Sequence, residues 1–137
     1  MVEIKIAYEG ELHCSALHVP SGNTIVTDAP VDNNGLGQAF SPTDLMATAL
    51  GTCIATVMGI MAERKDLDIK GMTVVVRKTM SDTPPRRISC LEVDLSVPLP
   101  ADHPERRMFE SAGRSCPVHQ SIHPDIAVVM NWTWQEA

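Results

Sequence analysis

The sequence predicts one α+β domain built mainly from antiparallel strands, and three observations lead to this prediction. The chain has 137 residues, a common length for one domain. Short segments of alternating hydrophobicity lie on both sides of one long uncharged segment with helical character. The strands and helices do not alternate as β-α-β units, which disfavours a parallel doubly wound sheet. A composition of 44% apolar and 20% charged residues is that of a folded protein.

The first third of the chain predicts a meander of short strands. Residues 2–7 alternate between apolar and polar side chains, and Gly10 separates them from a second strand over 11–19. A turn then precedes a short strand over 24–27. The segment 28–37 is rich in Pro, Asn, Asp and Gly, so it is expected to be a loop.

A helix is predicted to begin directly after Ser41. Ser41 is a favourable N-cap residue, and Pro42 suits the first helical position. Asp44 can complete a capping box and places its charge at the positive end of the helix dipole. We therefore interpret Asp44 first as a capping residue, with a functional role as the alternative.

The 18 residues 45–62 contain no charged side chain, a length that could span a membrane. Threonines and glycines lower the hydrophobicity of this segment. It also lacks the basic and aromatic residues that flank membrane spans. A helix that is apolar on all sides and rich in small residues is typical of the buried centre of a globular protein or oligomer. We therefore expect no membrane association.

Three strands are expected in the second half, over 72–80, 88–97 and 126–134. The alternation of the second strand shifts near Cys90, which indicates a β-bulge or a displaced boundary. Between the last two strands, Asp102 or His103 is expected to cap a second helix, which Pro117 interrupts. Residues spaced by four would line one stripe of this helix: Met108, Ala112 and Cys116.

The net charge of −6 comes with no extended basic cluster, so nucleic acid is not an expected partner. The first residues do not show the positively charged segment and following apolar segment of a signal peptide. A cytoplasmic location is therefore the default expectation. That compartment keeps thiols reduced, so the four cysteines are expected to be free, metal-bound or redox-active.

Cys53, inside the uncharged helix, and Cys116, at the helix-breaking proline, could bring two thiols together. A thiolate that attacks a peroxide becomes a sulfenic acid, and a second thiol can then form a disulfide with it. The plainer alternative is that all four cysteines are small apolar fillers. A zinc site from Cys116, His119 and His123 is a further alternative, although structural zinc usually has four ligands.

Two motifs carry a resemblance to a known family. Ser41-Pro42-Thr43-Asp44-Leu45 followed by Ala47-Thr48-Ala49-Leu50-Gly51-Thr52-Cys53 resembles the central-helix signature of the OsmC/Ohr family, and Ser115-Cys116-Pro117-Val118-His119 resembles its second-cysteine signature. The resemblance implies an intertwined α+β homodimer that reduces organic hydroperoxides without a metal or flavin cofactor. It implies Cys53 as the peroxidatic cysteine, Cys116 as the resolving cysteine and a dithiol as the reductant, with Asp44, Thr43 and His119 in supporting roles.

The chain departs from this pattern at one activating residue. In the better characterised branches an arginine from an N-terminal strand holds the reactive thiolate, whereas no arginine or lysine occurs here between Lys5 and Arg64. The candidates for a substitute cation are Arg77, Arg87 and Arg114, and the sequence places none of them near Cys53. The alternative function is therefore an OsmC-like protein without peroxidase turnover, which binds a small ligand or responds to redox state through its thiols.

Overall fold

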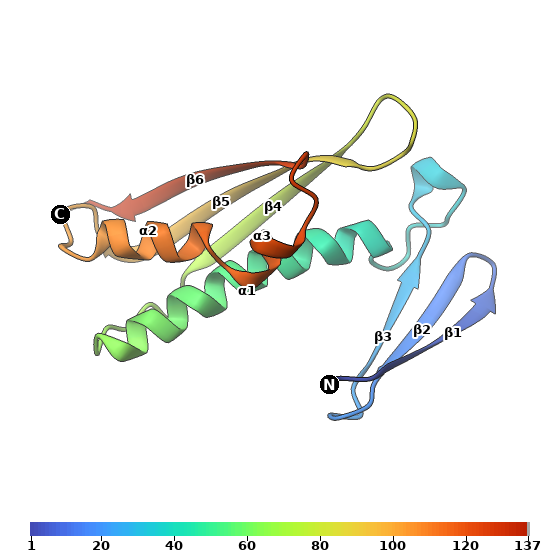
Figure 1. Cartoon of the computed structure of the whole chain (residues 1–137), viewed down its shortest axis with the longest axis horizontal. Coiled ribbons are helices and arrows are strands. Elements are labelled where there is room, and N and C mark those ends of the chain that lie inside the picture. Colours follow the sequence, from blue (N-terminus) through green and yellow to red (C-terminus); the bar gives the residue numbers. More distant parts are fainter. Residues whose placement is uncertain (137) are drawn as a thin grey trace. The chain divides into compact units, whose positions relative to one another are not determined.

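The computed structural model describes residues 1–136, which form two compact units (Figure 1). The first unit comprises Met1–Met46, and the second begins at Ala47. The long helix α1 (Pro42–Arg64) starts in the first unit and continues into the second. The expectation of a single domain therefore stays a prediction, and each unit is described by itself.

The first unit contains the predicted meander. Strands β1 (Ile4–Gly10), β2 (His13–His18) and β3 (Thr24–Asp28) form an antiparallel sheet in the order β1-β2-β3. The predicted loop that follows contains one short 3₁₀ turn, Val31–Asn33. Buried Asp28 anchors this loop, because its Oδ2 accepts a hydrogen bond from the Gln38 N–H at 3.0 Å.

One face of this sheet is apolar and exposed. Ile6 lies opposite Ala16, which lies opposite Ile25, so these three residues share a face across the strands. Ile4 and Tyr8 belong to the same face by the two-residue period of β1. Ile4, Ile6, Tyr8 and Ile25 are all more than half exposed, so this face has no cover within its own unit.

Helix α1 begins with the predicted capping box. The Ser41 N–H donates to Asp44 Oδ2 at 3.0 Å, and the Asp44 N–H donates to Ser41 Oγ at 3.1 Å. Ser41 is buried, so its polar groups depend on these partners. The helix continues through the uncharged segment and ends at Arg64, whose charge favours the negative end of the dipole.

Within the single chain, the uncharged helix buries one face and leaves another exposed. Its fully or nearly buried residues recur at helical spacing: Ala47, Leu50, Ile54, Met58 and Ala62. A second stripe, Thr48, Thr52, Thr56 and Ile60, is exposed. The hydroxyls of Thr52 and Thr56 donate to backbone carbonyls four residues earlier, which makes this stripe less polar than its composition suggests.

By length and composition alone, α1 is apolar enough to cross a membrane, with a mean hydropathy of 1.8. A long core helix of a globular protein passes the same test. No other helix within residues 1–136 passes it.

The second unit contains a three-stranded sheet in the order β4-β5-β6. Strand β4 (Thr73–Met80) pairs antiparallel with β5 (Ile88–Pro100), and β5 pairs parallel with β6 (Ala127–Gln135). The parallel pair arises because helices connect β5 to β6. A register shift places Thr79 opposite Cys90 but Met80 opposite Ile88, which confirms the bulge predicted near Cys90.

The connection between β5 and β6 corrects the predicted second helix. Helix α2 (Arg106–Arg114) has Glu105 as its N-cap, not Asp102 or His103, although the His103 ring accepts the Glu105 N–H at 3.1 Å. The helix ends before Cys116, so Cys116 does not extend the stripe of Met108 and Ala112. Cys116 is instead the N-cap of a separate helix, α3 (Pro117–Ser121).

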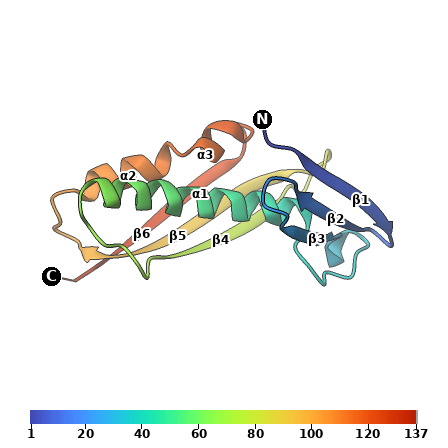
Figure 2. The ribbon, with the colours of Figure 1, turned by 90° about the horizontal axis from the view of Figure 1, so that it is seen from below.

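All three helices lie on one face of the second sheet (Figure 2). The inward side chains of β5, Leu91, Val93, Leu95 and Val97, are at most 1% exposed and pack with Leu50, Ile54 and Met58 of α1. Phe109 of α2 is fully buried in the same core. This core fixes α1 and α2 to the same sheet.

Gly51 allows α1 to approach β4 closely, and this contact gives a stability prediction. A Cβ atom at position 51 would lie 2.8 Å from Val76 Cγ2. We expect Gly51→Ala to lower the free energy of unfolding by about 1–3 kcal/mol, as overpacked cores do. In a Val76→Ala background, where Cγ2 is removed, the same substitution should cost less in urea unfolding. Equal costs in both backgrounds would show that this contact does not limit the approach.

Candidate thiol site

The chain break at Cys116 creates the buried half of the candidate site. Pro117 disfavours the helical conformation for the residue before it, and Cys116 is accordingly extended, with φ −63° and ψ 151°. Its side chain therefore turns back onto α3, where Sγ accepts the His119 N–H at 3.4 Å. Cys116 is fully buried, with no exposed surface.

Cys53 supplies the second thiol from the middle of α1. It lies between the buried residues Leu50 and Ile54 and packs against the same core, but it keeps part of its surface exposed. The Cys53 side chain lies close enough to Cys116 to raise the pKa of the Cys116 thiol. The structure thus brings together the two cysteines that the sequence singled out.

The environment of Cys116 favours its protonated form. Burial raises the pKa of the Cys116 thiol above its ordinary value, and the neighbouring Cys53 raises it further. The backbone N–H groups of His119 and Val118 act in the opposite direction, because they stabilise a thiolate. The net effect is a raised pKa, so Cys116 is a neutral thiol at neutral pH.

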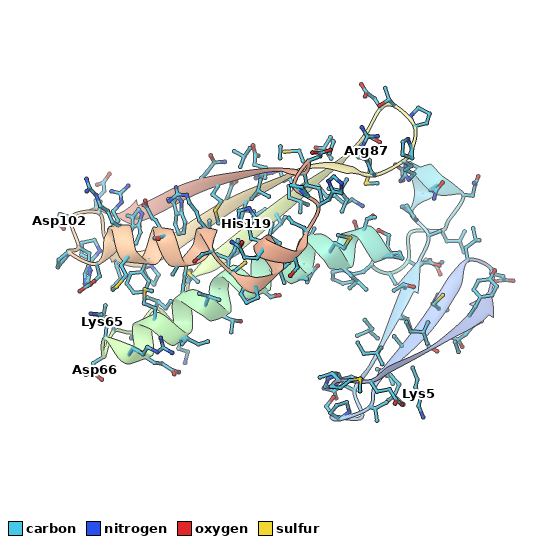
Figure 3. All side chains as sticks on the ribbon, in the orientation of Figure 1. Lys5, Lys65, Asp66, Arg87, Asp102 and His119 are labelled. Atoms are coloured by element: carbon cyan, nitrogen blue, oxygen red, sulfur yellow. The ribbon has the colours of Figure 1, made fainter. Side chains whose placement is uncertain are left out.

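His119 holds the short helix α3 against the end of α2 (Figure 3). Its Nδ1 lies 2.7 Å from the Arg114 carbonyl oxygen. A carbonyl oxygen can only accept, so Nδ1 carries the proton and donates. His119 therefore supports Cys116 twice, through its backbone N–H and through this contact. His119 also lines a pocket of about 460 Å³, together with Gln120, Ile122, His123, Pro124 and Ile126.

The side chains of the three candidate arginines contact groups other than the two thiols. Arg77 pairs with Asp94 at 2.6 Å and Glu92 at 3.2 Å, on exposed side chains of β4 and β5. Arg87 donates to the carbonyl oxygens of Thr83 and Pro85 in the loop between those strands. Arg114 lies over the Trp132 ring, with Cζ 5.9 Å from the ring centroid.

Thr43 and Asp44 lie at the start of α1, away from the thiols along the same helix. Nine residues separate Asp44 from Cys53, which corresponds to about 13.5 Å of helix axis. The Asp44 carboxylate completes the capping box, and Thr43 Oγ1 lies 3.2 Å from Ser41 Oγ. Within the described residues, no three His, Cys, Asp or Glu side chains come together as a metal site, so the zinc alternative gains no support.

The sequence analysis missed a polar network that ties α2 to β6. Glu110 Oε1 accepts from Arg106 Nε at 3.0 Å and from Trp134 Nε1 at 3.1 Å, and the Arg106 guanidinium lies over the Trp134 ring. The four-residue spacing of Arg106, Glu110 and Arg114 was the available signal, because such residues share a helix face. The network fixes the helix that immediately precedes Cys116.

The raised pKa of Cys116 predicts a pH dependence of stability. A thiol whose pKa is higher in the folded than in the unfolded state stabilises the protein below the unfolded pKa, and this contribution is lost as the pH rises through the folded pKa. The ordinary pKa of a cysteine thiol is 9.0. As the pH rises from below to above this value, the free energy of unfolding should therefore fall by more in wild type than in Cys116→Ala. Urea unfolding across that range measures the difference. Parallel pH profiles for the two proteins would contradict the assignment.

Comparisons with known proteins place this chain in a family. No curated protein matches the sequence. A solved structure of an osmotic stress induced and detoxification response protein from Psychrobacter arcticus is 43% identical, with a TM-score of 0.90 and 96% of each chain covered. An OsmC-like protein from Mycoplasma pneumoniae is 17% identical, with a TM-score of 0.80, 98% of this chain and 96% of that chain covered.

An organic hydroperoxide resistance protein from Legionella pneumophila is 14% identical, with a TM-score of 0.76, 97% of this chain and 96% of that chain covered. At this identity the likeness shows the fold alone. The sequence model described as OsmC-like protein matches residues 35–131, a range that includes both cysteines of the thiol pair. The chain therefore belongs to the OsmC-like protein family.

Proposed function

We propose that this protein reduces organic hydroperoxides through its thiols, as part of oxidative-stress defence. The observation that carries the proposal is the closeness of Cys53 and Cys116, which pack in the same core cluster and interact. A disulfide needs two cysteines whose side chains meet in this way. Membership of a family whose structural neighbours include organic hydroperoxide resistance proteins supports the class of substrate.

The different burial of the two thiols supports their roles. Cys53 is partly exposed, so a peroxide can reach it, whereas Cys116 is fully buried and its pKa is raised. We therefore assign Cys53 as the peroxidatic and Cys116 as the resolving cysteine. His119 is a positioning residue, since its contacts hold Cys116 and not the peroxide.

The proposed reaction has two steps on the protein. The Cys53 thiolate attacks one oxygen of the O–O bond, which breaks; the alkoxide takes a proton and leaves as an alcohol, and Cys53 becomes a sulfenic acid. The Cys116 sulfur then attacks the Cys53 sulfur, and water leaves as the disulfide forms. A dithiol reductant restores both thiols and becomes a disulfide itself.

The positions of the arginines favour a second candidate function. The contacts of Arg77, Arg87 and Arg114 are with groups other than the thiols, and a thiolate without a neighbouring cation is less populated at neutral pH. The second candidate is thus a thiol protein without turnover, which binds a small ligand or responds to redox state. Thermal stabilisation by a ligand with no loss of peroxide would favour it.

Two exposed surfaces support a homodimer. The stripe of α1 formed by Thr48, Thr52, Thr56 and Ile60 carries no charge, and one face of the β1-β2-β3 sheet exposes several large apolar side chains. Uncharged and apolar surfaces of this kind mark interfaces between proteins. We also propose a cytoplasmic location, in line with four free cysteines.

A matched pair of charge substitutions tests the dimer. Ile60 on α1 and Val129 on β6 are similarly exposed, at 45% and 42%. We expect Ile60→Glu to reduce the mass in sedimentation or light scattering to that of one chain, because a buried unpaired charge opposes association. Val129→Glu should leave the mass unchanged. Circular dichroism checks that both variants fold, and a folded Ile60→Glu variant with wild-type mass would contradict the proposed interface.

Peroxide chemistry is tested by mapping the thiols after one equivalent of cumene hydroperoxide. Wild type should form a Cys53–Cys116 disulfide, and Cys116→Ser should accumulate sulfenic acid on Cys53, which a dimedone probe traps. Cys53→Ser should consume no peroxide above the buffer rate, since the attacking sulfur is gone. The Cys14→Ser, Cys90→Ser double variant is the matched control and should react as wild type does. If wild type keeps both thiols reduced for hours, the protein is not a hydroperoxide reductase.

A further inference from the structure

We infer that the dithiol reductant attacks the disulfide at the Cys53 sulfur, so that Cys116 is the leaving group. This inference rests on the proposed function, because it concerns the regeneration of the same Cys53–Cys116 pair. The two sulfurs of that disulfide are not equivalent in this fold. They differ in their exposure and in the hydrogen-bond donors around them.

Access favours attack at Cys53. An incoming thiolate must approach a disulfide nearly in line with the S–S bond, from the side opposite the leaving sulfur. Cys116 is fully buried and belongs to the hydrophobic core with Leu50 and Phe109, so this approach to its sulfur is closed. Cys53 retains exposed surface on α1, and the sulfur that a thiolate can reach is the one attacked.

A hydrogen-bond donor partly offsets the cost of placing charge on Cys116. When the S–S bond breaks, negative charge develops on the departing sulfur, and a stabilised thiolate leaves faster. The backbone N–H of His119 donates to Cys116 Sγ. Burial is the largest cause of the raised pKa of Cys116 and opposes this charge, so exposure decides which sulfur is attacked.

The step balances as a thiol–disulfide exchange. The first thiolate of the reductant bonds to Cys53 Sγ, the Cys53–Cys116 bond breaks, and its electron pair leaves on Cys116 Sγ, which then takes a proton. The second thiolate of the reductant attacks its own partner sulfur in the mixed disulfide. Cys53 leaves as a thiolate, and the reductant departs as an oxidised cyclic or intramolecular disulfide.

A monothiol probe makes the mixed disulfide easier to trap at early times, because it carries no second thiol of its own and only another probe molecule can release Cys53. The Cys53–Cys116 disulfide is formed with diamide in the Cys14→Ser, Cys90→Ser background, which leaves no other thiol to exchange. The protein then reacts with excess cysteamine, is quenched by N-ethylmaleimide, and is mapped by peptide mass. We expect cysteamine on Cys53 and maleimide on Cys116. Cysteamine predominantly on Cys116, or equally on both, would overturn the inference.

A second measurement tests access without any disulfide in the protein. In the same background, Cys116→Ser leaves Cys53 as the remaining thiol and Cys53→Ser leaves Cys116. The first should react with 5,5′-dithiobis(2-nitrobenzoate) faster than the second, and both should react equally after unfolding in urea. Equal rates in the folded proteins would contradict the inference.

The two proposals fail in distinguishable ways. Diamide forms the disulfide whether or not the protein reduces hydroperoxides, so the position of the cysteamine adduct is independent of peroxide turnover. A Cys53 adduct without peroxide consumption would uphold this inference and reject the proposed enzyme. A Cys116 adduct with normal peroxide consumption would do the reverse.

Discussion

The break in the chain at Cys116–Pro117 is the constraint on which the thiol site depends. A continuous helix would leave Cys116 on the stripe of α2. Pro117 prevents a continuous helix, and α3 begins at Pro117 itself. The cysteine becomes an N-cap whose sulfur accepts a backbone N–H from α3. Glu110 secures α2 on one side of the break, and the His119 ring secures α3 to α2 across it.

The same core that buries Cys116 also places Cys53 beside it. Helix α1 can lie close to the sheet because Gly51 has no side chain to meet Val76. Leu50 and Ile54, on either side of Cys53, are fully buried and fix the rotation of the helix. One thiol is therefore enclosed and the other partly open, although both belong to the same cluster. This difference in burial underlies the proposed roles and the proposed direction of disulfide reduction.

Local signals predicted much of the fold, since capping residues, alternation and proline act within a few residues. The capping box of Ser41 and Asp44 and the bulge near Cys90 both follow from such patterns. The boundary of α2 and the parallel pairing of β5 with β6 did not, because they depend on contacts between distant segments. Cys53 and Cys116 lie 63 positions apart in the sequence, so their places in two helical segments allowed a contact and the family motifs indicated it.

The central claim is that the paired thiols exchange electrons with a hydroperoxide, and rapid-quench mass spectrometry tests it most directly. Reduced protein is mixed with one equivalent of cumene hydroperoxide, quenched with acid at successive times and weighed intact. The account predicts that the chain loses two hydrogen atoms as the Cys53–Cys116 disulfide forms, at the rate at which cumyl alcohol appears. A chain whose mass stays unchanged while the hydroperoxide persists would contradict it.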